Sequence, residues 1–219
     1  MIVAAHNEAD RIGATLDAVA RAFPSAHVVV ADDASRDGTG DIALARGAQL
    51  VRRGRPHGKG ANVSAAAQSV LAGVDDGATI VLCDADLGSS ATELRSLVAA
   101  VERGDCDLAV AAFRRRLGGG LGLTLGFARW AIERRCGYRA ATPISGQRAM
   151  RAAVLRTALP FAPGYGMETG MTIDAVRAGH RVCEVELGLE HRATGRDLAG
   201  FLHRGRQLRD IARAYLSRR

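Results

Sequence analysis

The first half of the chain alternates short apolar runs with longer segments whose apolar residues recur every three or four positions. The short runs predict buried strands, and the wider spacing predicts helices with one apolar face. We expect strands over residues 1–5, 27–31, 49–52, 79–83 and 108–112, and helices over residues 8–22, 38–46, 61–71 and 92–102. Strands separated by helices indicate βαβ units, and therefore a parallel sheet with right-handed crossovers.

The pattern is less regular after residue 113. We expect helices over residues 123–135, 167–178 and 198–216, and strands over residues 142–150 and 181–187. The last helix is basic and amphipathic, and we expect its apolar side to pack on the core of the protein. That side consists of Leu198, Phe201, Leu202, Leu208, Ile211, Ala212 and Tyr215. No repeat or linker divides the chain, so we predict one domain.

Two aspartates follow the apolar run of residues 80–83 directly. Open α/β sheets bind ligands at the carboxyl ends of their strands. Asp84 and Asp86 are two positions apart, so on a continuing strand they would face the same side. Two such carboxylates repel each other, and a divalent cation that carries a phosphorylated ligand would relieve the repulsion. The structural alternative is a helix cap with a spare acid before Ser89.

Polar residues also follow the first two predicted strands. Asp33 would accept hydrogen bonds from a base or ribose, or would cap the helix that begins near Gly38. Asn7 and Glu8 follow the first strand and would lie at the same sheet edge. A structural role explains them equally well, with Asn7 as a helix cap and Glu8 as an acid in the first turn of that helix.

The chain has a single lysine, Lys59, between two glycines. Gly58 and Gly60 would allow close backbone approach, and the ammonium would meet a phosphate as a point charge. A surface turn with a solvated lysine is the alternative. No Walker A motif occurs, and no G-x-G-x-x-G follows the first strand, which argues against a Rossmann dehydrogenase.

Composition narrows the classes of partner. The 219 residues carry a formal net charge of +7, which favours anionic partners, and only 4% of them are aromatic. The low aromatic content argues against a base-stacking nucleic-acid platform, and we expect no nucleic-acid partner. The four cysteines form no C-x-x-C pair, so we expect free thiols in a reducing cytoplasm. We expect neither a signal peptide nor a membrane-spanning segment, since the chain starts in a strand and its glycine-rich stretch near residue 120 is too short.

Four segments of the first half together resemble the ordered motifs of family-2 glycosyltransferases. They are IVAAHNE (residues 2–8), VADDASRDGT (30–39), GKG (58–60) and CDADL (83–87). The resemblance covers residues 1–112 and implies a GT-A fold, an α/β fold with a Rossmann-like, mostly parallel central sheet flanked by helices. It implies that Asp33 binds the nucleobase, that Ala5 and Glu8 line the same pocket, and that Lys59 contacts the donor. Asp84 and Asp86 would hold Mg²⁺ or Mn²⁺ on the diphosphate of a nucleotide sugar.

Motifs of the second half extend the resemblance toward two groups. The segment ISGQRA (residues 144–149) is similar to an acceptor-side segment of polyprenyl-phosphate sugar synthases. The segments GYGMETG (164–170) and EHR (190–192) are more similar to glucosyl-3-phosphoglycerate synthases. The resemblance implies that Glu168 lies at the acceptor site and that His191 completes the metal shell. Substrate contacts are expected from Gly146, Gln147 and Arg148.

We therefore expect a glycosyltransferase domain over residues 1–219, in which residues 1–112 bind the nucleotide sugar and residues 113–219 bind the acceptor. It would move a hexosyl group from a UDP-glucose or GDP-mannose type of donor to a phosphorylated or hydroxyl acceptor, such as a phosphoglycerate-like molecule. The metal held by Asp86 would stabilise the leaving group, and Glu168 would orient or deprotonate an acceptor hydroxyl.

Alternatives stay open at this point. For a polyprenyl phosphate acceptor, Arg114, Arg115, Arg116 and Arg148 would position the phosphate, and the last helix would meet the inner face of the membrane. A non-catalytic nucleotide-binding module is the rival from another class, and the sequence leaves a homodimer open. A sugar nucleotidyltransferase is less favoured, because the loop after Ala5 lacks a glycine-rich sequence.

Overall fold

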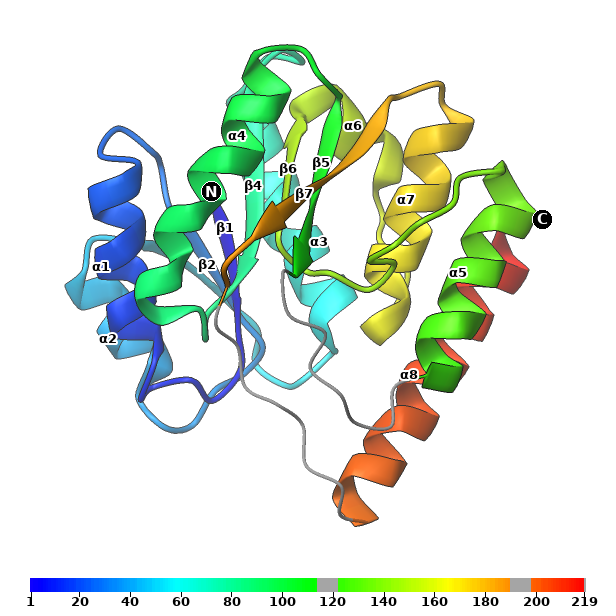
Figure 1. The fold of residues 1–219 in the computed structure, drawn as a ribbon. Coiled ribbons are helices and arrows are strands. Elements are labelled where there is room, and N and C mark those ends of the chain that lie inside the picture. The colour runs from blue at the N-terminus through cyan, green and yellow to red at the C-terminus, as the bar shows by residue number, and fades with distance from the viewer. Residues whose placement is uncertain (114–121, 190–197, 219) are drawn as a thin grey trace.

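The computed structural model describes residues 1–113, 122–189 and 198–218 (Figure 1). Seven strands form a sheet with the order β3-β2-β1-β4-β6-β5-β7, and helices cover both of its faces. The strands are β1 (Ile2–Ala5), β2 (Val29–Asp32), β3 (Gln49–Arg52), β4 (Thr79–Asp84), β5 (Leu108–Phe113), β6 (Arg148–Arg151) and β7 (Val182–Leu187). Strand β6 runs antiparallel to β4 and β5, and the other pairs are parallel. The predicted mostly parallel α/β fold is therefore confirmed.

Two apolar layers hold the helices on the sheet. The helical elements are α1 (Ile12–Ala22), α2 (Thr39–Ala45), α3 (Lys59–Leu71), η1 (Gly88–Leu94), α4 (Arg95–Glu102), α5 (Gly122–Cys136), α6 (Ala152–Ala158), η2 (Gly164–Gly166), α7 (Met167–Arg177) and α8 (Leu198–Ser217). Val3 of β1 packs in one layer with α1 and α4, while its neighbour Ile2 packs in the other with α3, α6 and α7. This follows from the alternation of side chains along a strand. Helices α5 and α8 contact α7 and lie side by side outside it (Figure 1).

The first helix begins at Ile12 and not at residue 8. The residues before it bond to the loop after β2: the amide of Asn7 donates to the Ser35 hydroxyl, and the amide of Glu8 donates to that of Thr39. Asn7 has a φ of 54°, in the left-handed region, so it does not act as the expected helix cap. It ties two loops together instead.

The strand expected over residues 142–150 is confined to β6. The preceding residues form a loop, in which Glu184 of β7 accepts hydrogen bonds from the amide and the hydroxyl of Thr142 at 3.2 and 3.0 Å. Helix α6, which follows β6 directly, was not expected. Its seven residues are too few to show a helical repeat of apolar positions.

The expectation of four free cysteines was wrong for two of them. Cys106, two residues before β5, and Cys183 of β7 form a disulfide, with 5.8 Å between their Cα atoms. This separation lies within the range that a disulfide spans. Cys83 and Cys136 are free. Sequence spacing did not reveal the pair, because 77 positions separate cysteines that only the sheet brings together.

Helix α8 packs on the protein, as expected, but with a partly different face. Ile211 and Ala214 are buried, whereas Leu208 is largely exposed, contrary to the expectation. Tyr215 packs against Trp130 of α5, with ring centroids 5.0 Å apart. The side chains of residues 198–204 lie outside the described part of the structure.

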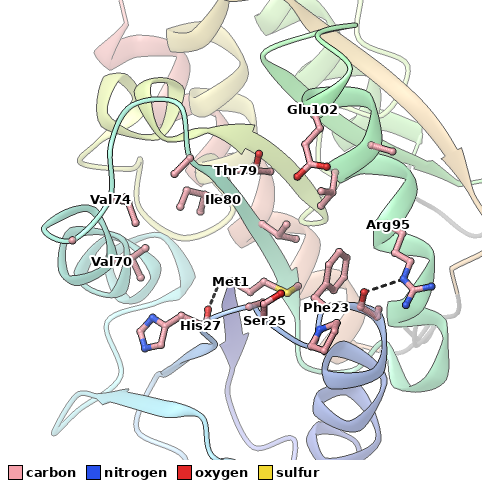
Figure 2. A pocket seen from close by; sticks show the side chains of 18 of the residues that line it. Met1, Phe23, Ser25, His27, Val70, Val74, Thr79, Ile80, Arg95 and Glu102 are labelled. Carbon is pink, nitrogen blue, oxygen red and sulfur yellow. Dashed lines mark hydrogen bonds between the residues drawn. The ribbon is translucent and has the colours of Figure 1, made fainter.

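A cavity of about 890 Å³ lies at the amino ends of β1 and β4. Figure 2 shows Met1, Thr79 and Ile80 in its wall, with Val70 of α3 on one side and Arg95 of α4 on the other. Because the parallel strands run away from this end, the cavity is remote from the residues that follow β4. Among the described helices, none is long and apolar enough to cross a membrane.

Gly60 provides a test of how tightly α3 is packed. A Cβ atom at Gly60 would overlap the backbone carbonyl oxygen of Ala162. A backbone atom cannot move aside as the end of a flexible side chain can. We expect Gly60→Ala to lower the free energy of unfolding by about 1–3 kcal/mol. Gly73→Ala, where a Cβ would meet nothing within 4 Å, should change it by at most about 1 kcal/mol. Urea denaturation measures both, and equal stability of the two variants would contradict the packing.

Candidate active site

The loops that carry the predicted site residues meet at the carboxyl end of the central strand β1. The amide of Asp33, after β2, donates to the carbonyl of Ala5 at 3.0 Å. The amide of Ala85, after β4, donates to the carbonyl of Ala4 at 3.0 Å. Strand β1 pairs with both β2 and β4, so its last two residues fix where the acidic loops begin.

Asp33 ties the loop after β2 to the loop that precedes Lys59. Its Oδ1 accepts a hydrogen bond from the amide of His57 at 2.8 Å, and its Oδ2 accepts one from the amide of Gly58 at 2.9 Å. It does not cap the next helix, because Asp37 accepts the bond from the Thr39 amide there. A nucleobase contact of Asp33 stays a prediction, and it would use lone pairs that the two amides leave available.

Lys59, the first residue of α3, joins carboxylates from the two halves of the chain. Its Nζ lies 2.6 Å from Oδ1 of Asp84 and 2.9 Å from Oε1 of Glu168. Gln147 donates from Nε2 to the second oxygen of Asp84 at 2.9 Å. A Cβ atom at Gly146 would lie 2.5 Å from Nζ and 2.7 Å from that oxygen, so a larger residue would displace the ion pair. We call Lys59, Asp84 and Glu168 the bridging cluster.

The electrostatics of the bridging cluster favour a charged lysine. Burial by itself lowers the pKa of Lys59, but the Asp84 and Glu168 carboxylates more than compensate and hold it above its usual value. Glu168 is 4% exposed, and a carboxylate so buried needs such a partner. The buried Arg148 guanidinium also interacts with Glu168, so two cations lie near this carboxylate.

Helix α1 holds the turn that contains Asp86. Strand β4 ends at Asp84, so Asp86 lies beyond it and the alternation argument for a shared side does not apply. The hydroxyl of Thr15 donates to the carbonyl of Ala85 at 2.7 Å, and Arg11 donates to the carbonyl of Asp86 at 3.2 Å. Sequence analysis missed both supporting residues. A signal was present, since Thr15 is a polar residue within an apolar helix face.

Arg148 does not take the position expected of an acceptor contact. Its side chain is completely buried in β6, where it donates to the carbonyl of Ser145 at 2.8 Å and to the hydroxyl of Thr172 at 3.0 Å. Burial lowers its pKa to about 10, and the nearby Glu168 opposes that shift, so the guanidinium stays charged at neutral pH. Arg148 therefore holds the loop that carries Gly146 and Gln147 through its hydrogen bond to the Ser145 carbonyl.

The structure also places two residues that the resemblance assigns to the donor pocket. Ala5 is buried, and Glu8 is partly exposed at the same sheet edge. Their substrate roles stay predictions. His191 lies outside the described residues, and so do Glu190, Arg192 and Arg114 to Arg116.

The acidic residues at this edge fit a hard divalent cation that takes most of its ligands from substrate and water. Within the described ranges, no three His, Cys, Asp or Glu side chains form a complete cation site. Mg²⁺ commonly binds through one or two carboxylates together with substrate phosphates, and Asp84 and Asp86 match that pattern. Lys59 and Gln147 already donate to Asp84, but each carboxylate oxygen can accept more than one partner.

The family model described as Glycosyl transferase family 2 matches residues 1–158. The chain belongs to glycosyl transferase family 2. It is 30% identical to an undecaprenyl-phosphate mannosyltransferase of Micrococcus luteus over 216 residues, covering 89% of this chain and 84% of that protein. It is 31% identical to a glucosyl-3-phosphoglycerate synthase of Mycolicibacterium paratuberculosis over 249 residues, covering 100% of this chain and 71% of that protein.

Solved structures of this family confirm the GT-A fold. Glucosyl-3-phosphoglycerate synthase from Mycobacterium tuberculosis in complex with phosphoglyceric acid is 27% identical, with a TM-score of 0.80 over 99% of this chain and 78% of that chain. The same enzyme with Mn²⁺, uridine-diphosphate-glucose and phosphoglyceric acid gives a TM-score of 0.77 at 27% identity and the same coverage. The family-2 chain described here is accordingly a glycosyltransferase.

Replacing Lys59 tests the bridging cluster. Lys59→Met leaves two carboxylates facing each other without a cation, so we expect the free energy of unfolding at pH 7 to fall by about 3–5 kcal/mol. Lys59→Arg keeps the charge and should cost less. Arg139→Met, which removes a cation from an exposed pair with Glu133, is the control and should cost at most about 1 kcal/mol. Urea denaturation of all three variants decides the matter, and a Lys59→Met protein as stable as the control would contradict the cluster.

Proposed function

We propose that this family-2 glycosyltransferase transfers a hexosyl group from a UDP-glucose type of nucleotide sugar to a small phosphorylated hydroxy acid of the phosphoglycerate class. The observation that carries the proposal is the contact of Lys59 with both Asp84 and Glu168. Asp84 belongs to the half expected to bind the donor, and Glu168 belongs to the half expected to bind the acceptor. The Mycobacterium tuberculosis enzyme, whose structures contain UDP-glucose with phosphoglyceric acid, supports this choice of substrates.

The donor half would comprise residues 1–112. Asp33 would bind the base, with Ala5 and Glu8 beside it. Asp84 and Asp86 would hold Mg²⁺ or Mn²⁺, with His191 as a third ligand, and the bound cation would neutralise charge on the diphosphate leaving group. Structures of the Mycobacterium tuberculosis enzyme with Mn²⁺ or Mg²⁺ and UDP support this cation. Lys59 would add a fixed positive charge next to that leaving group.

The acceptor half would comprise residues 113–219. Glu168 would accept the proton of the attacking acceptor hydroxyl, and its contact with Lys59 would hold the carboxylate in place for that step. Gly146 and Gln147 would line the path between acceptor and donor, because both lie against Asp84. Arg148 would act indirectly, through the loop that it supports.

The first test asks whether Asp86 carries the cation. We expect Asp86→Asn to lower the rate of Mn²⁺-dependent UDP release, in the presence of UDP-glucose and 3-phosphoglycerate, by about 10²–10³-fold. The same variant should lose the rise in melting temperature that Mn²⁺ with UDP gives the wild type. Asp41→Asn, on the exposed side of α2, is the control and should leave both measurements unchanged. Full activity of Asp86→Asn at saturating Mn²⁺ would rule out this assignment.

One observation favours a second acceptor, a polyprenyl phosphate at a membrane surface. Leu123 and Trp130 of α5 are 89% and 48% exposed on a helix that also carries Arg129, Arg134 and Arg135. Exposed apolar side chains among arginines suit the surface of an anionic membrane. The similarity to the undecaprenyl-phosphate mannosyltransferase points in the same direction.

The two acceptors make opposite predictions. With 3-phosphoglycerate as the acceptor, we expect soluble glucosylated product and no flotation with anionic liposomes at low salt. With a polyprenyl phosphate, the protein should float with those liposomes, and Leu123→Ser with Trp130→Ser should abolish flotation without changing UDP-Mn²⁺ binding. Flotation together with lipid-linked product, and no turnover of 3-phosphoglycerate, would overturn the first choice.

A further inference from the structure

Asp210 is a buried carboxylate in the middle of the C-terminal helix α8. It is 7% exposed. It contacts Tyr165, which lies more than 40 positions earlier in the chain. Burying a carboxylate costs free energy unless hydrogen bonds or charges compensate. Two partners do so here: the backbone amide of Tyr165, at 3.3 Å from Oδ2, and the guanidinium of Arg209, at 3.4 Å from Oδ1.

The segment η2 is shaped to receive this carboxylate. A Cβ atom at Gly164 would overlap Oδ2 of Asp210, and a Cβ at Gly166 would lie 2.5 Å from the Asp210 backbone carbonyl. Gly164 also has a φ of 57°, which side chains other than glycine rarely adopt. Gly164 and Gly166 therefore leave room for Asp210, and the Tyr165 amide donates a hydrogen bond to it.

The same segment also lies against the start of α3. A Cβ at Gly58 would lie 3.7 Å from the Cα of Gly164, and a Cβ at Gly60 would lie 3.4 Å from the Gly164 amide nitrogen. Between those two glycines is Lys59. The segment thus contacts both α8 and the glycines on either side of Lys59.

Glu168 is the second residue after this segment and lies in the first turn of α7, which begins at Met167. The position of residues 164–166 therefore sets the entry of α7 and, with it, the direction of the Glu168 carboxylate toward Lys59. A displacement of about 1 Å at such a point is enough to lower a rate by as much as 10²-fold.

We propose that Asp210 is a positioning residue for the acceptor side of the site. It holds residues 164–166 through the Tyr165 amide, and those residues set Glu168 against Lys59. This inference rests on the proposed function in one respect, the role of Glu168 at the acceptor. It assigns to the C-terminal helix a part in the geometry of the site that the sequence motifs do not contain.

The test compares three variants. Asp210→Ala removes the acceptor of the Tyr165 hydrogen bond, and Asp210→Asn retains an oxygen that can accept it. Asp174→Ala is the matched control, because Asp174 of α7 pairs with Arg218, the residue after the end of α8, at 2.6 Å. Removing this pair loosens α8 at a point away from Tyr165. If Asp210→Ala does not fold, Asp210→Val, which is nearer to aspartate in volume than leucine and has no hydrogen-bond acceptor, takes its place.

Hydrogen exchange gives a readout that does not depend on activity. We expect the peptide containing Tyr165 to exchange at least about tenfold faster in Asp210→Ala than in the wild type, with no such increase in Asp210→Asn or Asp174→Ala. Unchanged exchange in Asp210→Ala, or an equal increase in Asp174→Ala, would overturn the positioning role. This result stands even if the wild type fails to turn over 3-phosphoglycerate, which would reject the proposed function instead.

Kinetics then separate positioning from general destabilisation. In Asp210→Ala, kcat/KM for the acceptor should fall by about 10–10²-fold, while the Kd of UDP with Mn²⁺, measured by calorimetry, should stay within about twofold of the wild type. Asp210→Asn should restore most of the acceptor kcat/KM. Equal losses for donor and acceptor, or failure of Asn to restore activity where the exchange rate is normal, would contradict the inference.

Discussion

The structure depends on one ammonium group held between two carboxylates. Lys59 lies within 3 Å of both Asp84 and Glu168, residues that come from opposite halves of the chain. Without a cation between them, the two carboxylates would repel each other, and Glu168 is almost completely buried. The ion pairs thus join the half that resembles a nucleotide-sugar domain to the half that carries the acceptor motifs. Gly146 is required beside them, because any larger residue would occupy the place of the ammonium.

The sheet explains why these groups can meet. The carbonyls at the end of β1 receive the amides of Asp33 and Ala85, so the loops after β2 and β4 start from fixed points. Strand β6 is inserted antiparallel between β4 and β5, which places the loop before it directly beside Asp84. Helix α1 then holds the turn around Asp86 through Arg11 and Thr15. Hydrogen bonds to the backbone thus position the loops that carry Asp33 and Asp86.

Sequence patterns predicted the strands and most helices well, but they did not predict the long-range contacts that hold these elements in place. Apolar periodicity located the parallel strands and most helices, because burial of one face leaves a repeat in the sequence. It misplaced the start of α1, since Asn7 and Glu8 bond to a loop that lies some thirty positions away. It overlooked α6 because the helix has only seven residues. It overlooked the Cys106–Cys183 disulfide because 77 positions separate the two cysteines. Arg148 was expected to contact the acceptor, yet its guanidinium is buried in the core. The positive charge of the residue suggested a substrate contact and gave no sign of this burial.

The sequence by itself determined the α/β class, the order of the elements and the presence of acids after β2 and β4. These properties depend on residue type and local spacing, which every stretch of chain carries with it. Only the tertiary structure decided that Lys59 pairs with Glu168, that Arg148 supports a loop from within, and that Asp210 reaches the Tyr165 amide. Such contacts join residues that are tens of positions apart, and their energies depend on burial and distance, which no local pattern records.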